Sequence, residues 1–273
     1  MLTNFLTQVR QRQPLVHCIT NYITANDCAN LLLACGASPI MADDPEEAAE
    51  ITAHADALVL NLGTLHSQTL PAMLASGRQA NALGLPVLLD PVGVGASAFR
   101  ARAAAQLLEQ VRFTAIRGNS SEIKVLAQGS GLAHGVDAAP QDQLTACTLP
   151  QTEALAQSLA RRTGAVVALT GAADLVTDGQ NSWVVRNGHP MMARVTGTGC
   201  QLSALTGAFL AASPQQASWA TVAALCTMGL AGGLAAQRLL PGQGNASYRT
   251  AIIDTIYHLT PEELEAGAKY EMQ

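Results

Sequence analysis

The segment Val195-Thr-Gly197-Thr198-Gly199-Cys200 places a glycine-rich turn directly before Gln-Leu-Ser-Ala-Leu-Thr-Gly-Ala-Phe-Leu, which is helical in character. Free backbone N–H groups would point out of such a turn, and with the helix dipole they form a site for an anion, such as a phosphoryl group in transfer. The alternative is a glycine loop needed only for close packing, because short glycine patterns are weak signals.

Two acidic segments follow expected strands. Asp90 opens Asp-Pro-Val-Gly-Val-Gly95, and Glu122 closes Asn119-Ser-Ser-Glu122. Two carboxylates at one sheet edge could hold Mg²⁺ through water molecules. Asn119 and Glu122 also have the spacing of a helix capping box, so a purely structural cap is the other interpretation.

Arg117 and Thr170 also lie at strand ends. Arg117 could pair with nucleotide phosphates through its planar set of donors, or it could form a structural ion pair. Thr170 could offer a hydroxyl to a phosphate, or Thr170-Gly171 could be an ordinary tight turn. All five elements fall on the same predicted edge of the sheet, and this agreement favours a phosphoryl-transfer site.

The elements that would position these residues alternate between strand and helix, which is typical of an α/β fold with a parallel sheet. Ligands bind outside the carboxyl ends of the strands in such sheets. Asp174–Asp178 and Ser182–Arg186 flank a turn and predict a hairpin at the sheet edge. We expect one domain, 1–273, since no linker or fixed-period repeat is present. The expected strands are Ala57–Leu62, Pro86–Asp90, Phe113–Ile116 and Ala165–Leu169.

The composition excludes several classes of protein. A net charge of -5 without a cluster of Lys or Arg argues against nucleic-acid binding. Ala217–Leu240 is apolar but contains Gln, Arg, Thr and Gly, so it predicts a buried helix rather than a membrane span. The first 13 residues predict an amphipathic helix without a signal-peptide pattern. The six cysteines form no Cys-x-x-Cys pair and suggest a reducing compartment, so we expect a cytoplasmic enzyme.

Only 13% of the residues are charged, while 49% are hydrophobic. Part of the surface is therefore expected to be buried against other subunits, since exposed apolar patches usually mark interfaces.

Six segments together resemble the hydroxyethylthiazole kinases of thiamine biosynthesis and salvage, which belong to the ribokinase-like group. The resemblance spans nearly the whole chain, and its segments are specific only in combination. They are Thr20-Asn21-Tyr22-Ile23-Thr24, Gly36-Ala-Ser-Pro-Ile-Met41-Ala, Asn61-Leu-Gly-Thr-Leu65, Leu89-Asp90-Pro-Val-Gly-Val-Gly95, Ile116-Arg117-Gly-Asn-Ser-Ser-Glu122 and Gly197-Thr-Gly-Cys200.

The resemblance implies a ribokinase-like α/β fold, with a central, mainly parallel sheet flanked by helices on both faces. It also implies a homotrimer with active sites between subunits, and ATP-dependent phosphorylation of the hydroxyl of 4-methyl-5-(2-hydroxyethyl)thiazole. By resemblance Arg117 and Thr170 contact ATP, Met41 and Gly197 contact the thiazole, and Asn21 is a weaker candidate for the substrate pocket. Asp90 and Glu122 would organise Mg²⁺.

Cys200 occupies the position where related ribokinase-like enzymes usually carry an aspartate base. A helix N-terminus lowers a thiol pKa, so we expect some thiolate at neutral pH. The alternatives are a small residue that merely fits the helix start, and the nucleophile of a hydrolase or acyltransferase, which would need a histidine near the thiol. A kinase for another vitamin precursor, such as a hydroxymethylpyrimidine or pyridoxal, and a non-catalytic metabolite-binding protein also remain open.

The six histidines show no metal-ligand spacing. We expect them at the surface or at helix caps, with His17, close to the Asn21 segment, as the possible exception.

Overall fold

The computed structural model describes residues 1–128 and 148–273. In these residues nine strands form a single sheet with the order β2-β1-β3-β4-β5-β6-β7-β8-β9. The strands are β1 (Leu15–Ile19), β2 (Ser38–Ile40), β3 (Ala57–Asn61), β4 (Val87–Asp90), β5 (Ala115–Asn119), β6 (Val166–Thr170), β7 (Asp174–Thr177), β8 (Ser182–Val185) and β9 (Tyr270–Met272). Strands β1 to β6 pair in parallel, while β7, β8 and β9 are antiparallel.

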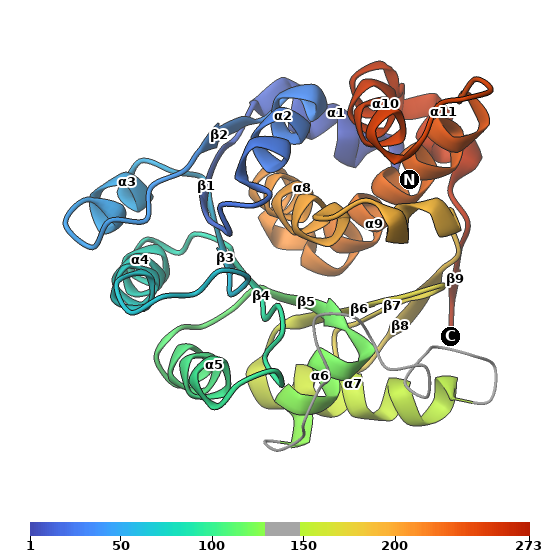
Figure 1. Ribbon diagram of the computed structural model, residues 1–273. Helices are drawn as coiled ribbons and strands as arrows, with labels where there is room; N and C mark the ends of the chain where they lie inside the picture. The colour runs from blue at the N-terminus through green and yellow to red at the C-terminus, as the bar shows by residue number, and fades with distance from the viewer. Residues whose placement is uncertain (129–147) are drawn as a thin grey trace.

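Helices cover both faces of this sheet (Figure 1). In that view α1, α2, α8, α9, α10 and α11 lie above the sheet, and α3 to α7 lie below it. The helices are α1 (Thr3–Arg12), α2 (Ala25–Cys35), α3 (Ala48–Ala53), α4 (Thr69–Leu83), α5 (Ala98–Gln110), α6 (Ser120–Gln128), α7 (Leu149–Thr163), α8 (Thr198–Ala212), α9 (Ala217–Gln237), α10 (Asn245–His258) and α11 (Pro261–Gly267), with short 3₁₀ turns η2 (Pro190–Arg194) and η3 (Pro214–Gln216). The expected α/β fold with a mainly parallel, doubly covered sheet is confirmed.

The sheet separates two hydrophobic cores, which we call the upper and lower core after Figure 1. Strand β3 serves both, because successive side chains of a strand point to opposite faces. Ala57 and Val59 belong to the upper core, and Leu58 and Leu60 to the lower core. A strand buried on both faces therefore consists of a continuous apolar run, as expected for a parallel sheet between helices.

The direction of strand addition reverses between β1 and β3. From β1 the chain passes through α2 above the sheet to β2, and then returns to β3 on the other side of β1. From β3 onward each new strand is added away from β1, with α4 below the sheet. Such a reversal opens a crevice outside the carboxyl ends of the strands, where α/β proteins bind their ligands.

Helices α8 and α9 are largely apolar all round and contribute many residues to the upper core. The stretch Pro214–Gln237 is long and apolar enough to cross a membrane, with a mean hydropathy of 1.5, but 72% of it is buried inside the fold. The expected buried helix over Ala217–Leu240 is thus confirmed, with its end at Gln237.

Three strands were not expected from the sequence: β1, β2 and β9. Strand β9 pairs with β8, so the predicted hairpin β7–β8 exists but does not form the sheet edge. Strand β5 runs to Asn119 rather than ending at Ile116, because Arg117, Gly118 and Asn119 continue the parallel pairing with β6. Cys147 and His134 lie outside the described residues.

Candidate active site

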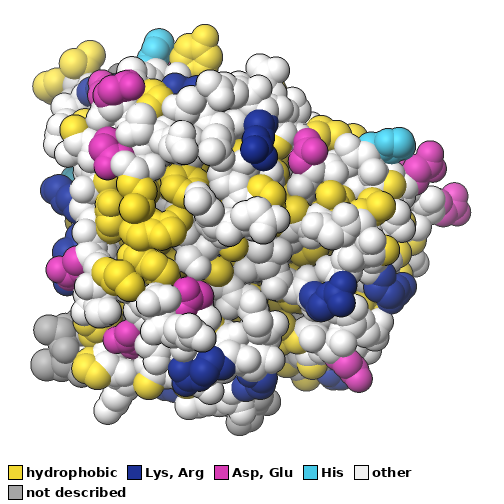
Figure 2. Space-filling view, turned by 180° about the vertical axis from the view of Figure 1, so that it is seen from behind, with side chains coloured by type: hydrophobic (Ala, Val, Ile, Leu, Met, Phe, Trp, Pro, Cys, Tyr) yellow, Lys and Arg dark blue, Asp and Glu magenta, His cyan; other side chains and the backbone are white. Residues whose placement is uncertain are grey.

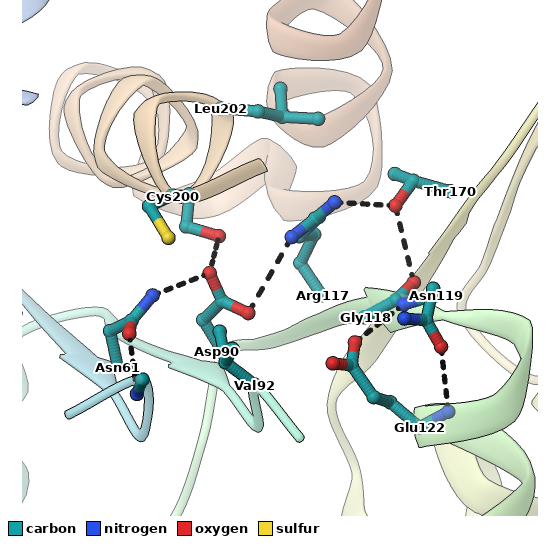
Figure 3. A network of polar contacts seen from close by, with 12 residues as sticks. Asn61, Asp90, Val92, Arg117, Gly118, Asn119, Glu122, Thr170, Cys200 and Leu202 are labelled. Carbon is teal, nitrogen blue, oxygen red and sulfur yellow. Dashed lines mark hydrogen bonds and ion pairs between the residues drawn. The ribbon is translucent and has the colours of Figure 1, made fainter. Parts of the chain in front are cut away.

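Polar residues end four neighbouring parallel strands at one edge of the sheet. Asn61 of β3 pairs with Asp90 of β4, and Asn119 of β5 pairs with Thr170 of β6. Parallel pairing places these strand ends beside one another, so the predicted meeting of these residues at one edge of the sheet is confirmed. Their side chains converge below the start of α8 (Figure 3).

Helix α8 begins at Thr198, with Gly197 as its N-cap. Gly197 has φ 86°, a left-handed conformation that glycine adopts without steric cost. Gly199 lies against Arg117, because a Cβ at Gly199 would fall 2.6 Å from Arg117 Nη1. The turn therefore places the first N–H groups of a helix and a guanidinium side by side, as an anion site requires.

We expect Gly197→Ala to lower the free energy of unfolding by about 3 kcal/mol, since it combines left-handed strain with overpacking. A Cβ at this position would lie 2.9 Å from the Cβ of Thr24, on the neighbouring α2. Gly84→Ala is the matched control, because Gly84 also has positive φ (71°) but nothing within 4 Å of the added Cβ. Urea unfolding of both variants measures the difference, and equal losses would show that contact with Thr24 is unimportant.

The carboxylate of Asp90 is wholly buried at the centre of a polar network (Figure 3). Its Oδ2 accepts hydrogen bonds from Asn61 Nδ2 at 2.8 Å and from Ser203 Oγ of α8 at 2.7 Å. Its Oδ1 lies 3.5 Å from Arg117 Nη1 and has no hydrogen-bond partner among the described residues. Burial raises the pKa of Asp90, while Arg117, Ser203 and Asn61 act in the opposite direction.

Arg117 connects Asp90 to Thr170. Its Nη2 donates to Thr170 Oγ1 at 2.6 Å, and its Nη1 forms the ion pair with Asp90. Both interpretations drawn from the sequence are therefore compatible, since the guanidinium makes a structural ion pair and also faces the helix start where an anion would bind. Burying a charge pair of this kind costs free energy unless the pair is well hydrogen-bonded. Buried charges with perturbed pKa values are common at functional sites.

Glu122 forms the predicted capping box. Its backbone N–H donates to Asn119 Oδ1 at 2.9 Å, and its Oε2 accepts from the Asn119 N–H at 2.8 Å. Its other oxygen, Oε1, accepts from the N–H of Gly93 at 2.8 Å and so ties α6 to the turn after Asp90. Burial, and then the charge of Asp90, raise the pKa of Glu122 to about 7.

These two carboxylates fit a bound Mg²⁺. Asp90 Oδ1 is buried without a hydrogen bond, and each oxygen of Glu122 uses only one of its acceptor positions on a backbone N–H. Mg²⁺ usually takes one or two carboxylates together with waters and phosphate oxygens.

The pKa of Cys200 differs from the sequence expectation. A lowered pKa and some thiolate were expected from the helix N-terminus, but burial and then the charge of Asp90 raise the thiol pKa. Cys200 Sγ accepts a hydrogen bond from the amide of Asn21 at 3.1 Å, and no imidazole of the described residues bonds to it. A raised pKa and an amide neighbour both argue against the cysteine hydrolase alternative, whose nucleophile needs a lowered pKa or an adjacent base.

The remaining sequence candidates lie at the same edge. Asn21 follows β1 and is 5% exposed, with its amide within the polar network. Met41 follows β2, whose carboxyl end also faces this edge, and packs partly buried against the upper core. His17, the exception named among the histidines, is buried and bonds to Thr52 Oγ1 and the carbonyl of Ala42 rather than lying at the surface.

Sequence reasoning missed two members of the network, Asn61 and Ser203. Asn61 stands in one of the segments that carry the family resemblance, and it ends a strand, which is the placement that marked Asp90. Ser203 follows Cys200 by three residues on α8, so both lie on one face of the helix. A search for polar residues one turn after the glycine-rich start would have found it.

Asp174, the first residue of β7, was also missed. Its carboxylate accepts a hydrogen bond from the N–H of Gly171 at 2.9 Å, and burial raises its pKa to about 7. The folded protein therefore holds a proton between about pH 4 and 7 that the unfolded chain releases. Stability from this group is greatest below pH 4 and is lost as the pH rises through 7.

At pH 8 we expect Asp174→Asn to have a free energy of unfolding about 2 kcal/mol higher than that of the parent. The amide oxygen can still accept from the N–H of Gly171, and the charge that burial disfavours is gone. The advantage should vanish near pH 4 in urea unfolding experiments. Asp178→Asn is the control, and it should change the free energy of unfolding in the opposite direction. Burial raises the pKa of Asp178, but the N–H groups of Asn181 and Gln180 outweigh burial and hold it below its ordinary value. An advantage of Asp174→Asn that persists at pH 4 would contradict the raised pKa.

Comparison with known proteins gives a consistent assignment. The model of the Hydroxyethylthiazole kinase family matches residues 6–262. A protein of Clostridium acetobutylicum named hydroxyethylthiazole kinase is 51% identical over 271 residues, which cover 99% of each chain. The solved structure of the hydroxyethylthiazole kinase protein from Pyrococcus horikoshii superimposes with a TM-score of 0.87 at 37% identity, covering 100% of this chain and 98% of that one.

A more distant structure shares the fold alone. Pyridoxal kinase from Staphylococcus aureus, in complex with AMP-PCP and pyridoxal, has a TM-score of 0.59 at 14% identity, with 95% of this chain and 98% of that chain covered. The near matches extend over the whole length of the chain and over the strand ends and helix start described above. The chain belongs to the hydroxyethylthiazole kinase family.

Proposed function

We propose that this protein transfers the γ-phosphoryl group of ATP to the hydroxyl of 4-methyl-5-(2-hydroxyethyl)thiazole, in thiamine biosynthesis or salvage. The observation that carries the proposal is the convergence of Asp90, Arg117 and Thr170 on the glycine-rich start of α8. Family membership supports the kinase activity and, with it, ATP as the co-substrate.

In the proposed reaction ATP contacts Arg117 and Thr170, and the thiazole contacts Met41 and the main chain at Gly197. The hydroxyl oxygen forms a bond to the γ-phosphorus, the bond from that phosphorus to the β–γ bridging oxygen breaks, and ADP leaves with the electron pair. The N–H groups at the start of α8 and the Arg117 guanidinium stabilise the negative charge of the moving group.

Cys200 is the proposed neighbour of the hydroxyl. Because its thiol pKa is raised, the sulfur keeps its own proton at neutral pH and positions the hydroxyl by a hydrogen bond. The hydroxyl proton then passes to water late in the transfer. This is tolerable because phosphoryl transfer has a loose transition state, in which positioning and charge neutralisation matter more than early deprotonation.

Asp90 and Glu122 are the proposed holders of Mg²⁺. When bound, the ion would neutralise phosphate charge and orient the triphosphate. It would also offset the repulsion between the two carboxylates that contributes to the raised pKa of Glu122.

Removal of Mg²⁺ with EDTA is expected to reduce ADP formation at least about a hundredfold, as for other Mg²⁺-dependent phosphoryl transfers. Asp90→Asn and Glu122→Gln should each raise the Mg²⁺ concentration for half-maximal rate at least about tenfold, since each removes one charged ligand. Rate measured against Mg²⁺ at fixed ATP gives both values. Asp254→Asn, at an exposed carboxylate on α10, is the control. Unchanged Mg²⁺ curves in both site variants would remove these residues from the metal site.

We further propose one domain over 1–273 and a cytoplasmic homotrimer with its sites between subunits. Tyr22 and Ile23, next to Asn21, are 77% and 60% exposed, which is unusual for large apolar side chains beside a polar site. Figure 2 shows a gathered hydrophobic patch on the back of the molecule, with charged side chains around it. Surfaces of this composition are typical of subunit interfaces. Light scattering of the purified protein measures the oligomeric state.

Incubation with ATP, Mg²⁺ and the thiazole alcohol tests the reaction. We expect ADP release and a phosphorylated thiazole by mass spectrometry, and little ADP with a hydroxymethylpyrimidine or pyridoxal as acceptor. ADP release that is no greater with the thiazole than without it would reject the proposed substrate. Equal rates with pyridoxal would favour the alternative vitamin precursor.

A further inference from the structure

Two asparagine side chains join Cys200 to Asp90, and their orientations are fixed by backbone donors. The N–H of Thr24 donates to Asn21 Oδ1 at 3.1 Å, and the N–H of Gly63 donates to Asn61 Oδ1 at 2.8 Å. Since a backbone N–H can only donate, the oxygen of each amide must face it. The nitrogen of Asn21 therefore faces Cys200, and the nitrogen of Asn61 faces Asp90.

The amide of Asn21 is fully used within the protein. Its oxygen accepts from both the N–H and the hydroxyl of Thr24, the latter at 2.9 Å. Its nitrogen donates to Asn61 Oδ1 at 3.2 Å and to Cys200 Sγ at 3.1 Å. An amide nitrogen has two protons and both are engaged, so this buried side chain has little hydrogen-bonding capacity left for a substrate.

The packing around the pair is equally restrictive. A Cβ at Gly63 would lie 2.8 Å from both Cβ and Nδ2 of Asn21, and 2.9 Å from Oδ1 of Asn61. The carbonyl of Gly63 in turn accepts a hydrogen bond from Arg100. The amides are thus held by hydrogen bonds at their polar ends and by a glycine backbone against their sides.

We propose that Asn21 is a positioning residue that acts on the reaction through Cys200, rather than a ligand of the thiazole. By donating to the sulfur, its amide holds Cys200 in place from one side, beside the side chains of Thr24 and Asn61. The same amide is braced by Asn61, so the position of the sulfur is coupled to that of the Asp90 carboxylate. This inference rests on the proposed role of Cys200.

A double-mutant cycle with Asn21→Leu and Cys200→Ala tests it. Asn21→Leu is expected to lower kcat about tenfold, the rate equivalent of one hydrogen bond, and to change KM for the thiazole alcohol less than about threefold. In the Cys200→Ala background the same substitution should change kcat less than about twofold, because the atom it acts on is gone.

Three results would overturn the proposal. A rise in KM of about tenfold in both backgrounds, with kcat unchanged, would make Asn21 a substrate ligand. Equal falls of kcat in both backgrounds would show that it acts independently of the sulfur. If Cys200→Ala alone leaves kcat unchanged, the proposed role of Cys200 fails, and the inference with it, while thiazole-dependent ADP release would still uphold the kinase reaction.

Gly63→Ala provides a second variant that removes no polar group. The added methyl displaces both amides, so kcat should fall to a similar extent and only when Cys200 is present. Gly244→Ala is the matched control, because a Cβ there meets nothing within 4 Å and the residue lies at the start of α10. A folded Gly63→Ala protein with unchanged kcat would contradict the proposal. This test holds even if the Asn21→Leu protein does not fold.

Discussion

Arg117→Leu is expected to lower the free energy of unfolding by about 3 kcal/mol at pH 8, because it leaves the Asp90 carboxylate buried without a cation. Asp90 is wholly buried, and Arg117 is the cation of its ion pair. With Arg117 gone, the pKa of Asp90 rises further, so the folded state binds a proton that the unfolded state releases. The deficit should therefore grow as the pH rises and shrink towards pH 4.

A second substitution, Asp90→Asn in the Arg117→Leu background, is expected to recover most of the stability. The asparagine oxygen can still accept from Asn61 and Ser203, and no charge remains unpaired. Activity should stay below about 1% of the parent in both proteins, since the proposed contacts to ATP and Mg²⁺ are lost. Recovery of activity together with stability would contradict these roles.

Arg186→Leu is the matched control for these unfolding measurements. Its ion pair with Glu271 is shorter, at 2.6 Å, but the two side chains are 56% and 53% exposed. Water screens such a pair, so we expect a loss of less than about 1 kcal/mol. A loss as large as that of Arg117→Leu would mean that burial is not the cause.

Replacement of Cys200 has the second large effect. Cys200→Ala is expected to lower kcat about tenfold to a hundredfold, because the hydroxyl loses its positioning partner. Cys200→Asp should retain or raise kcat. An aspartate starts from a pKa near 4 and a thiol from about 8.5, so even with the raising effects of burial and Asp90 a carboxylate accepts the hydroxyl proton more readily.

Steady-state kinetics with the thiazole alcohol as the varied substrate measures this series. Cys226→Ala serves as a control, because Cys226 is buried in the upper core on α9, outside the polar network. An inactive Cys200→Asp protein with a normal unfolding curve would count heavily against a side chain at this position that contacts the hydroxyl. Unchanged kcat in Cys200→Ala would leave the residue a small side chain that fits the helix start.

The parts of the fold that the sequence could predict are those with continuous apolar runs. Strands β3, β4 and β6 are buried on both faces and separated by helices, so their pattern is unambiguous. Strand β2 has only three residues with an exposed serine, and β9 is equally short and mostly exposed, so neither has a pattern to detect. Their positions depend on pairing with β1 and β8, which is tertiary information.

The site also has features that the sequence predicts and features that it does not. Asp90, Arg117, Glu122 and Thr170 follow recognisable strands, and the resemblance to a family supplied roles for them. The direction of the Cys200 pKa shift could not be predicted from the sequence, because the helix start favours thiolate whereas burial and the nearby Asp90 charge oppose it. Only the folded arrangement shows the burial and the nearby Asp90 charge that raise this pKa.

The polar network draws its members from a stretch that runs from Asn21 to Ser203. During synthesis on the ribosome, strands β1 to β6 are complete before α8 emerges. Until then Asp90 has no Ser203 donor, and the sheet lacks the helix that covers β1, β3 and β4. The nascent chain therefore carries part of an apolar sheet face without α8 until past residue 200, and transiently exposed apolar surface of this kind favours aggregation.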